Sequence, residues 1–212
     1  MSDIRVMLID DHAVMRTGMA RLLERSDNIT IVGEADTGEQ GYQLYSELKP
    51  DVMVMDMSMP GIGGLEALRR VISRYPDAKV IMFSMHENIT FAIQAMTAGA
   101  VGYVTKSGEA QELVTAVKQV VAGKSYLNAE MAHKIALQNM GGSDNPMQRL
   151  TAREFEVFRL LAEGLTIDEI AVNLTIGQKT VANYQTSLKQ KLGIQSSVDL
   201  VRLAMKHDVI SH

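Results

Sequence analysis

The chain of 212 residues has no cysteine and no tryptophan, and it has only four prolines. Without cysteine there are no disulfides, no thiol catalysis and no zinc sites with thiolate ligands. The histidines show none of the close spacings of zinc-binding motifs, so we expect isolated surface side chains at His12, His86, His133, His207 and His212. The composition therefore excludes thiol enzymes and cysteine-based metal proteins.

Long apolar segments are missing as well. No apolar run approaches the roughly 20 residues that cross a bilayer, and residues 1–5 lead directly into a strand-like segment without a secretory signal pattern. We therefore expect a cytoplasmic protein with no membrane partner. The length suits one α/β domain of roughly 120 residues and a smaller companion.

Charge is distributed unevenly along the chain. The formal net charge is −4, with −5 on residues 1–147 and +1 on residues 148–212. Residues 178–192 hold three lysines and no acidic residue. An acidic protein with one basic segment points to a confined anion-binding face near the C-terminal end of the sequence.

Strand-like apolar segments alternate with helical patterns over residues 1–122. The predicted strands are residues 4–9, 29–35, 52–55, 80–83 and 102–104, and the segments between them repeat apolar residues every three or four positions. Five such β/α repeats with right-handed crossovers predict a doubly wound α/β domain. We expect a flavodoxin-like, five-stranded parallel sheet with the strand order 2-1-3-4-5.

Polar side chains follow the predicted strands at the points where the strands end. Asp10 and Asp11 follow the first strand, Asp56 the third, Ser84 the fourth and Lys106 the fifth. In the predicted sheet these groups share one edge. Three carboxylates placed together would repel one another and have raised pKa values unless a cation joins them. A hard divalent ion such as Mg²⁺, which takes oxygen ligands, fits this edge.

Phosphoryl-transfer chemistry gives each of these groups a role. Asp56 is the candidate nucleophile, which accepts a phosphoryl group and becomes an aspartyl phosphate. The candidate ligands of Mg²⁺ are Asp10, Asp11, Asp56 and the backbone carbonyl of Ser58. The ion and the Lys106 ammonium would neutralise the phosphoryl oxygens, and the Ser84 hydroxyl could hydrogen-bond one of them.

Four segments resemble the receiver domain of bacterial response regulators. They are Ile-Asp-Asp-His at 9–12, Met-Asp-Met-Ser-Met-Pro-Gly at 55–61, Phe-Ser at 83–84 and Gly-Tyr-Val-Thr-Lys at 102–106. The resemblance covers about residues 3–122 and implies phosphorylation of Asp56 by a partner histidine kinase. It also implies that Tyr103 is an aromatic switch that turns inward when Ser84 closes on the phosphate. Many receivers have proline after the lysine, whereas Ser107 stands here, which leaves the shape of this loop open.

Two other classes of protein share parts of this pattern. Phosphatases with an aspartate nucleophile have a second aspartate two residues later, where this chain has Ser58. A flavodoxin-like cofactor binder has a phosphate-cradling loop after the first strand, where Asp10 and Asp11 would repel a phosphate. Both alternatives are weaker than the receiver. We expect no enzyme with an external substrate, although a receiver can catalyse its own phosphorylation and dephosphorylation.

Residues 123–149 are the predicted linker between two domains. The segment Gly-Lys-Ser at 123–125 breaks the last receiver helix, and residues 131–140 predict one short helix. Residues 141–146, Gly-Gly-Ser-Asp-Asn-Pro, are typical of a flexible tether. Such a linker would allow the two domains to separate or to dock.

Residues 150–212 predict a small all-α domain. Capping-box patterns at 151–154 and 166–169 open two helices, and a longer helix begins at about residue 178 after a glycine-containing turn. Two helices joined by such a turn, with the basic residues on the second, predict a helix-turn-helix. The second helix should enter the major groove of double-stranded DNA.

The second helix, whose predicted outward face also includes Ala182 and Gln190, supplies the candidate DNA contacts. They are Lys179, Thr180, Asn183, Tyr184, Thr186 and Lys189. Lysines would bind phosphates, and asparagine can read adenine through two hydrogen bonds. This domain resembles the LuxR/NarL type of DNA-binding domain through the motifs at 150–154, 169–171, 179–181 and 191–193. That type commonly has a basic residue where Ala182 stands and histidine where Tyr184 stands, which leaves affinity and specificity open.

The whole chain resembles a NarL/FixJ-family response regulator, and residues 61–67 with the Asn183-Tyr184 pair resemble its GacA/UvrY-type branch. The resemblance implies a transcription regulator that forms a homodimer when Asp56 is phosphorylated and places paired helices on two half-sites of promoter DNA. The alternative is a phosphorylation-controlled protein-interaction module whose helix-turn-helix no longer binds DNA, which Ala182 would support.

Overall fold

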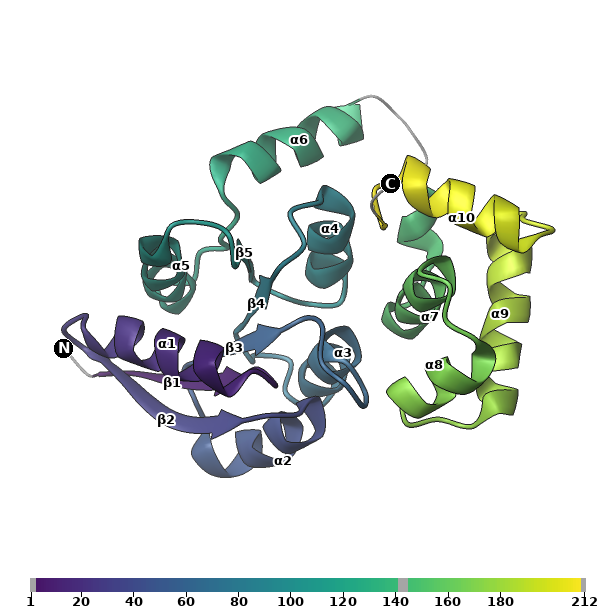
Figure 1. Cartoon of the computed structure of the whole chain (residues 1–212). Coiled ribbons are helices and arrows are strands. Elements are labelled where there is room, and N and C mark those ends of the chain that lie inside the picture. The colour runs from purple at the N-terminus through teal and green to yellow at the C-terminus, as the bar shows by residue number, and fades with distance from the viewer. Residues whose placement is uncertain (1–2, 141–144, 211–212) are drawn as a thin grey trace.

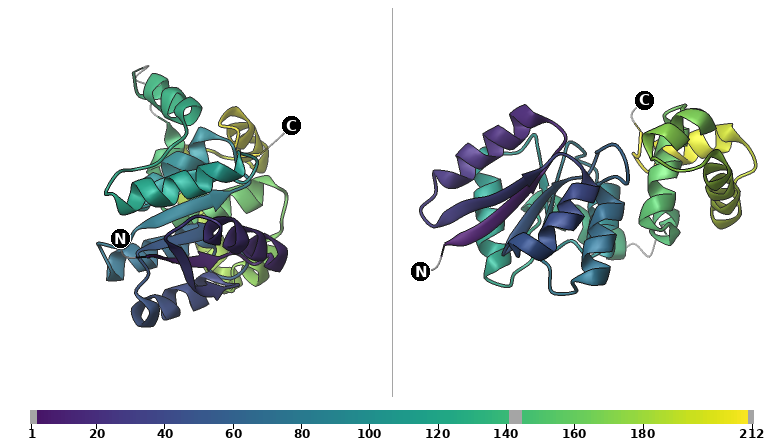
Figure 2. Two further views of the ribbon diagram at one scale, coloured as in Figure 1. Left: turned by 90° about the vertical axis from the view of Figure 1, so that its left-hand side faces the viewer. Right: turned by 90° about the horizontal axis from the view of Figure 1, so that it is seen from below.

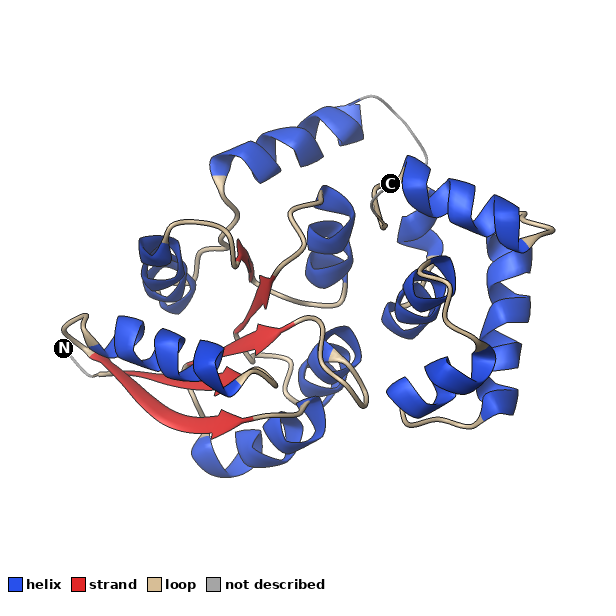
Figure 3. Cartoon of the chain, viewed as in Figure 1, coloured by secondary structure: helices blue, strands red, loops and turns tan. Residues whose placement is uncertain are grey.

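The computed structural model describes residues 3–140 and 145–210 of the chain. Its N-terminal part contains one parallel sheet with the strand order β2-β1-β3-β4-β5, and its C-terminal part consists of helices and loops (Figure 1, Figure 3). The strands are β1 Ile4–Ile9, β2 Ile29–Ala35, β3 Val52–Asp56, β4 Val80–Ser84 and β5 Gly102–Thr105. The predicted fold class and strand order are therefore confirmed.

The central strands explain the continuous apolar runs in the sequence. Every residue of β3 and β4 is buried, as expected for parallel strands that are covered on both faces. The predicted third, fourth and fifth strands each ended one residue too early. Asp56 still pairs with Phe83, and Ser84 with Thr105, because the ladder continues onto these polar residues. The functional side chains are thus held by sheet hydrogen bonding.

Helices cover both faces of the sheet (Figure 2). Helices α1 (Ala13–Glu24) and α5 (Ala110–Val121) pack on one face, against residues such as Leu8 and Val54. The other face carries α2 (Gly38–Leu48), α3 (Gly64–Arg74) and α4 (Ile89–Thr97), and it includes Met7 and Met55. Neighbouring strand residues serve opposite faces because successive side chains alternate. No helix in the described part of the chain is long and apolar enough to cross a membrane.

The junction contains one predicted helix and one that was not predicted. Helix α6 (Ala129–Met140) begins two residues before the predicted start. The predicted tether lies largely outside the described residues, since the description stops at 140 and resumes at 145. A 3-10 helix, η1 (Pro146–Arg149), then packs on α4, where the Gln94 side chain donates to the Met147 carbonyl. The end of the predicted tether is therefore a docked turn.

The C-terminal domain has four helices: α7 (Ala152–Ala162), α8 (Ile167–Asn173), α9 (Gln178–Leu192) and α10 (Ser197–Lys206). Thr151, Thr166 and Ser196 each form a capping box, which explains why α7, α8 and α10 begin where they do. Gly193, at φ +66°, ends α9 in the left-handed region. The predicted arrangement of α8, a turn and α9 is confirmed.

Candidate functional site

The polar groups predicted at the strand ends lie together at the carboxyl edge of the sheet. Asp10 follows β1 and Asp56 ends β3, and both are buried. The ligand atoms of Asp10, Asp11, His12 and Asp56 all lie within 4.8 Å of one another. The structure therefore brings together the three expected carboxylates. It also corrects the prediction for His12, which is part of this cluster and not an isolated side chain.

Lys106 reaches the carboxylates from the end of β5. Its backbone N–H donates to the Ser84 carbonyl (2.7 Å), which fixes the residue beside β4. Its ammonium lies 2.7 Å from Asp10 Oδ2 and 2.9 Å from Asp56 Oδ1, and only 4% of its side chain is exposed. Each of these buried charges thus has a partner, which a charge removed from water requires.

The charges at this edge remain unbalanced. Burial raises the pKa of Asp56, the neighbouring Asp10 adds to the shift, and Lys106 opposes it. Burial lowers the pKa of Lys106, but its contacts with Asp10 and Asp56 outweigh this effect and raise the pKa above the ordinary value. Lys106 therefore stays charged, and a single ammonium faces three carboxylates in the described cluster.

The donor set fits a hard divalent cation. Asp11 Oδ1 is buried, and the polar atom recorded beside it is His12 Nδ1, at 2.9 Å, so a lone pair of this oxygen remains available to a metal. Clustered carboxylate oxygens are the ligands that Mg²⁺ accepts, together with water. Ser58 lies just after β3 and its backbone hydrogen-bonds the Asp56 carboxylate. The role of its carbonyl as a ligand stays a prediction.

Ser84 and Tyr103 are both tied to the loop between β4 and α4. The Ser84 hydroxyl donates to Met57 Sδ (3.9 Å) and accepts from the His86 backbone N–H (3.1 Å). The Tyr103 hydroxyl donates to the His86 carbonyl (2.7 Å), and burial raises its pKa. Tyr103 is 1% exposed, so its ring already occupies an inward position. Its action as a switch stays a prediction.

His86 was predicted to be an isolated surface histidine, but its ring is half-buried at the site. Its ring is half-buried, stacks on Phe91 with centroids 3.8 Å apart, and lies with Nε2 3.2 Å from Ser58 Oγ. Burial, helped by the charge of Arg159, lowers the pKa of His86 to about 4. The imidazole is therefore neutral at pH 7. Its position two residues after Ser84 was the one signal in the sequence that could have placed it at the site.

The loop that follows Asp56 also contacts the C-terminal domain. The Gly61 N–H donates to the Asn173 carbonyl (2.9 Å) at the end of α8. The Arg153 guanidinium, on α7, donates to the Ile62 carbonyl (2.9 Å) and to the Leu174 carbonyl (2.7 Å). The site and the helix-turn-helix are therefore joined by hydrogen bonds to a single loop, which nothing in the sequence indicated.

Glu156 lies at the centre of this contact between the domains. Its carboxylate pairs with Arg153 (2.8 Å) and packs against Gly63, where a methyl group would lie 2.0 Å from Oε1. Burial raises the pKa of Glu156 to about 7, while Arg153 and Arg159 partly oppose the shift. Phe155, the preceding residue of α7, meets Phe91 edge to face, with ring centroids 5.2 Å apart. The contact thus combines apolar packing with a carboxyl that titrates near neutrality.

Most of the candidate DNA contacts on α9 are exposed. Lys179, Thr180, Asn183, Thr186 and Lys189 face solvent, whereas Val181 and Leu188 are buried in the domain core. The Thr186 hydroxyl donates to the Ala182 carbonyl (3.0 Å) within the helix. The Tyr184 ring is half-buried and packs against the core, and its role as a DNA contact stays a prediction. The closed arrangement of the two domains therefore leaves the basic face of α9 accessible.

Helix α9 is anchored to α7 by a polar contact. Lys191 Nζ lies 2.7 Å from Glu154 Oε2, and the Ser187 hydroxyl donates to Oε1 (2.8 Å). Burial raises the pKa of Glu154, but the bonds from Lys191, Thr151 and Ser187 outweigh it and lower the pKa to about 2. Lys191 therefore holds α9 against α7, and the candidate phosphate contacts on α9 are the two other lysines, Lys179 and Lys189.

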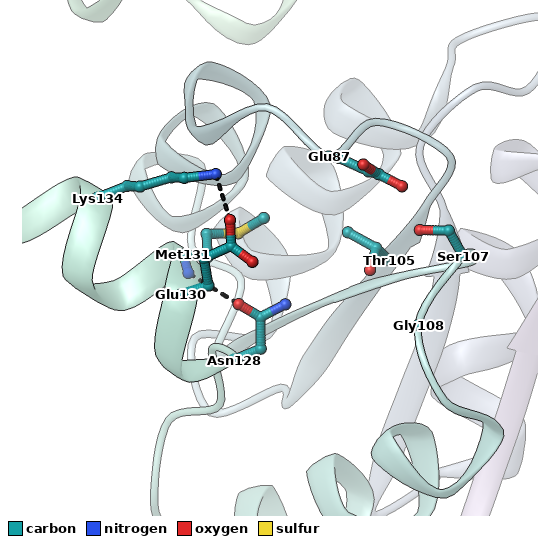
Figure 4. Close-up of a pocket in the computed structure, with 8 residues that line it drawn as sticks. All are labelled: Glu87, Thr105, Ser107, Gly108, Asn128, Glu130, Met131 and Lys134. Carbon is teal, nitrogen blue, oxygen red and sulfur yellow. Dashed lines mark hydrogen bonds and ion pairs between the residues drawn. The ribbon is translucent and has the colours of Figure 1, made fainter.

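A polar cavity of about 240 Å³ lies beside the site, between the loop after β5 and the start of α6 (Figure 4). Asn128 caps α6 by accepting from the Met131 N–H (2.8 Å), and Lys134 pairs with Glu130 (2.6 Å). Glu130 and Lys134 thus form an ion pair at the rim of the cavity. The cavity lies where α6 meets the loop after β5, and none of the predicted site residues lines it.

Comparison with known proteins assigns both parts of the chain. Residues 6–118 match the response regulator receiver domain, and residues 148–204 match the luxR family of bacterial regulatory proteins. The chain is 39% identical over 209 residues to the response regulator GacA of Pseudomonas aeruginosa, covering 98% of each chain. It is 37% identical over 206 residues to the response regulator UvrY of Escherichia coli K12, covering 96% of this chain and 94% of that one.

Solved structures agree with this assignment. A LuxR-family two-component response regulator from Aurantimonas is 41% identical with a TM-score of 0.63, covering 66% of this chain and 99% of that one. RcsB from Salmonella typhimurium is 25% identical with a TM-score of 0.73, covering 95% and 96%. Membership of this group implies that the partners are a histidine kinase and DNA. It also implies that the protein is a regulator and not a classical enzyme. The chain belongs to the NarL/FixJ family of response regulators, in its GacA/UvrY branch, and is a phosphorylation-controlled, DNA-binding transcription regulator.

Proposed function

We propose that Asp56 is the residue that receives the phosphoryl group from the kinase. The observation that carries this proposal is the pairing of its carboxylate with Lys106 at an edge that also holds Asp10 and Asp11. One Asp56 oxygen would attack the phosphorus of a phosphohistidine. A P–O bond forms while the P–N bond to the imidazole breaks, and the imidazole leaves after taking a proton from water.

Lys106 would stabilise the charge that develops during transfer. Its ammonium already lies 2.9 Å from the attacking carboxylate, so it can shift to a phosphoryl oxygen without reorganising the site. Asp10, Asp11, Asp56 and the Ser58 carbonyl would hold Mg²⁺, which supplies further positive charge to the phosphoryl oxygens when bound. The raised pKa of Asp56 makes its ionised carboxylate a better nucleophile.

Ser84 and Tyr103 would convert phosphorylation into a change of the loop after β4. If the Ser84 hydroxyl moves from Met57 to a phosphoryl oxygen, it must also release the His86 N–H that it now accepts. The His86 carbonyl accepts the hydrogen bond of the Tyr103 hydroxyl, so a displacement of His86 would also move or break the hydrogen bond of Tyr103. The receiver would also catalyse its own phosphorylation from small acyl phosphates, and its own dephosphorylation, with these residues.

Uptake of label tests the site. Wild type, incubated with a labelled acyl phosphate and Mg²⁺, should take up about one phosphoryl group per chain, and Asp56→Asn should take up none. Asp77→Asn, which changes an exposed carboxylate away from the sheet edge, is the matched control and should behave as wild type. Undiminished uptake by Asp56→Asn would show that the acceptor is another residue. Sustained hydrolysis of unrelated phosphoesters would favour a phosphatase.

For the output, we propose that α9 enters the major groove of promoter DNA. Lys179 and Lys189 would bind phosphates, and Thr180, Asn183 and Thr186 would meet base edges or phosphates. Tyr184, half-buried, would contribute through its hydroxyl edge. Phosphorylated chains would form a homodimer on two half-sites. We assign residues 1–122 to the receiver, 123–149 to the linker and 150–212 to the DNA-binding domain.

Salt dependence tests the proposed phosphate contacts. Lys179→Ala combined with Lys189→Ala should lower the slope of log K against log salt concentration by about 1.8, because each phosphate contact contributes about 0.9. Lys118→Ala, an exposed lysine on α5, is the matched control and should leave the slope unchanged. An unchanged slope in the double variant would remove α9 from the interface.

A further inference from the structure

His12 lies directly against the carboxylate cluster. Its Nδ1 is 2.9 Å from Asp11 Oδ1 and 3.3 Å from Asp10 Oδ1. Separations of this size are those of two adjacent ligands of one small ion, which lie about 3 Å apart when each metal–ligand bond is about 2.1 Å. The imidazole nitrogen is therefore placed as a ligand would be placed.

The whole set has nearly the dimensions of a single coordination sphere. Opposite ligands of an ion with bonds of about 2.1 Å are about 4.2 Å apart. The ligand atoms of Asp10, Asp11, His12 and Asp56 all lie within 4.8 Å of one another. A small inward movement of the side chains would bring them to one centre, and the buried Asp11 Oδ1, whose polar neighbour is His12 Nδ1 at 2.9 Å, lies among them.

The backbone holds His12 at this place while leaving its ring free to adjust. His12 is the N-cap residue of α1, and its backbone N–H donates to Asp10 Oδ1 (2.8 Å). Its side chain makes no capping hydrogen bond to the helix, and 69% of it is exposed. No helix contact has to be broken for Nδ1 to turn toward a metal.

We propose that His12 is an additional metal ligand, through Nδ1, and that it shifts the selectivity of the acidic site toward late first-row divalent ions such as Co²⁺ and Zn²⁺. The inference rests on the proposed metal site and adds a nitrogen ligand to its oxygens. Mg²⁺ gains little from a nitrogen donor, because it prefers oxygen and retains water. Imidazole favours later metals, whose affinity for nitrogen sites rises along the series toward copper.

A different arrangement would give His12 a purely electrostatic role. In that case the imidazole, when protonated, offsets the carboxylate charge, and any divalent ion displaces it. Removing the ring would then affect Mg²⁺ and Co²⁺ equally. Selectivity between the two ions therefore distinguishes the two arrangements.

The test titrates His12→Ala and wild type with Co²⁺ and with Mg²⁺. Visible absorption follows Co²⁺, because the ligand field bands respond to a nitrogen donor, and NMR shifts of the backbone amides near Asp10 follow Mg²⁺. The expected result is a loss of Co²⁺ affinity on the order of tenfold or more, a change in the Co²⁺ spectrum, and a Mg²⁺ affinity altered by less than about twofold. His133→Ala, an exposed histidine on α6, is the matched control.

Two outcomes would overturn the proposal: an unchanged Co²⁺ affinity in His12→Ala, or equal losses for Co²⁺ and Mg²⁺. Asp11→Asn separates this proposal from the metal site on which it rests. If Asp11→Asn binds both ions as wild type does, the acidic site itself is wrong. If it loses both ions while His12→Ala loses neither, only the role of His12 fails. Circular dichroism of each metal-free variant confirms that the fold is retained.

Discussion

Replacing Gly63 with alanine perturbs the contact between the two domains at its most crowded point. The new methyl group would lie 2.0 Å from Glu156 Oε1 and 2.8 Å from its Cδ. Glu156 has little room to move, because its carboxylate is buried and paired with Arg153, which itself donates to the Ile62 carbonyl. We expect the clash to be relieved by separation of the domains.

The size of the effect follows from overpacking. Inserting a methyl group into a filled contact costs about 1–3 kcal/mol, which lowers the ratio of closed to open molecules by roughly 5- to 150-fold. Gly63 also has φ +72°, where alanine is strained in both the closed and the open arrangement. Gly123→Ala is the matched control, because Gly123 has φ +80° and no atom within 4 Å of the added methyl group.

The assay uses the absence of cysteine from the chain. Cysteines introduced at the exposed positions Glu47, on α2, and Arg202, on α10, can carry spin labels, and pulsed electron resonance then reports the distance between the domains. Gly63→Ala should broaden the distance distribution and shift it to longer distances, while Gly123→Ala should lower thermal stability without changing the distance distribution. Identical distributions in Gly63→Ala and wild type would refute the interdomain contact.

Three further perturbations test the charged groups. The contact between the domains should be favoured by acid, because burial raises the pKa of Glu156 from its ordinary 4.5 to about 7 when the domains are docked, in the field of Arg153 and Arg159 on α7 and Glu66 on α3. Docking therefore takes up a proton, so the docked population, measured with the same spin labels, should fall as pH rises from 4.5 through 7 and stay constant in Glu156→Gln. A parallel pH dependence in Glu156→Gln would assign the effect to another group. Lys106→Met should lower the free energy of unfolding at pH 7 by about 3–5 kcal/mol, since two buried carboxylates lose their cation. Mg²⁺ should restore part of this stability in thermal unfolding, and a melting temperature equal to that of wild type would contradict the pairing. Glu154→Gln should lower the free energy of unfolding by about 1–3 kcal/mol at pH 7. Because the pKa of Glu154 is lowered to about 2, this stabilisation is complete above the ordinary pKa of a glutamate and disappears as pH falls toward 2. Denaturant unfolding should therefore show the stabilities of variant and wild type converging in acid, and a difference that persists there would argue against these bonds.

The sequence was sufficient for the sheet and its reactive edge. Alternating apolar segments predict the strands because buried parallel strands must be apolar along their length, and the order of the sheet follows from the rule for crossovers. Asp10, Asp56 and Lys106 could then be placed together, because side chains at the carboxyl ends of adjacent strands share one edge. The short distances from Lys106 to both aspartates agree with that placement.

The contacts between the domains could not be predicted. Periodicity describes one element at a time, and it does not reveal that the Gly61 N–H meets α8 or that Glu156 packs on Gly63. The histidines were placed wrongly for a related reason. His12 and His86 have no metal-site spacing along the chain, and only the fold brings them to the carboxylates and to Ser58.

The contact also bears on regulation. Five of the predicted DNA contacts on α9, namely Lys179, Thr180, Asn183, Thr186 and Lys189, are exposed in this arrangement, whereas Tyr184 is half-buried. Control by phosphorylation would therefore act through the relative placement of two α9 helices, as paired half-sites require. The loop after Asp56, which forms hydrogen bonds with both α7 and α8, joins the proposed acceptor to the C-terminal domain.

We propose that phosphorylation of Asp56 controls DNA binding by α9. The most direct measurement is the affinity of wild type and Asp56→Asn for promoter fragments obtained by genome-wide capture, each with and without an acyl phosphate and Mg²⁺, at fixed salt concentration. The phosphodonor should tighten binding of wild type by tenfold or more, on the order of 1.4 kcal/mol, and leave the affinity of Asp56→Asn unchanged. Equal tightening in both proteins, or none in wild type, would contradict it.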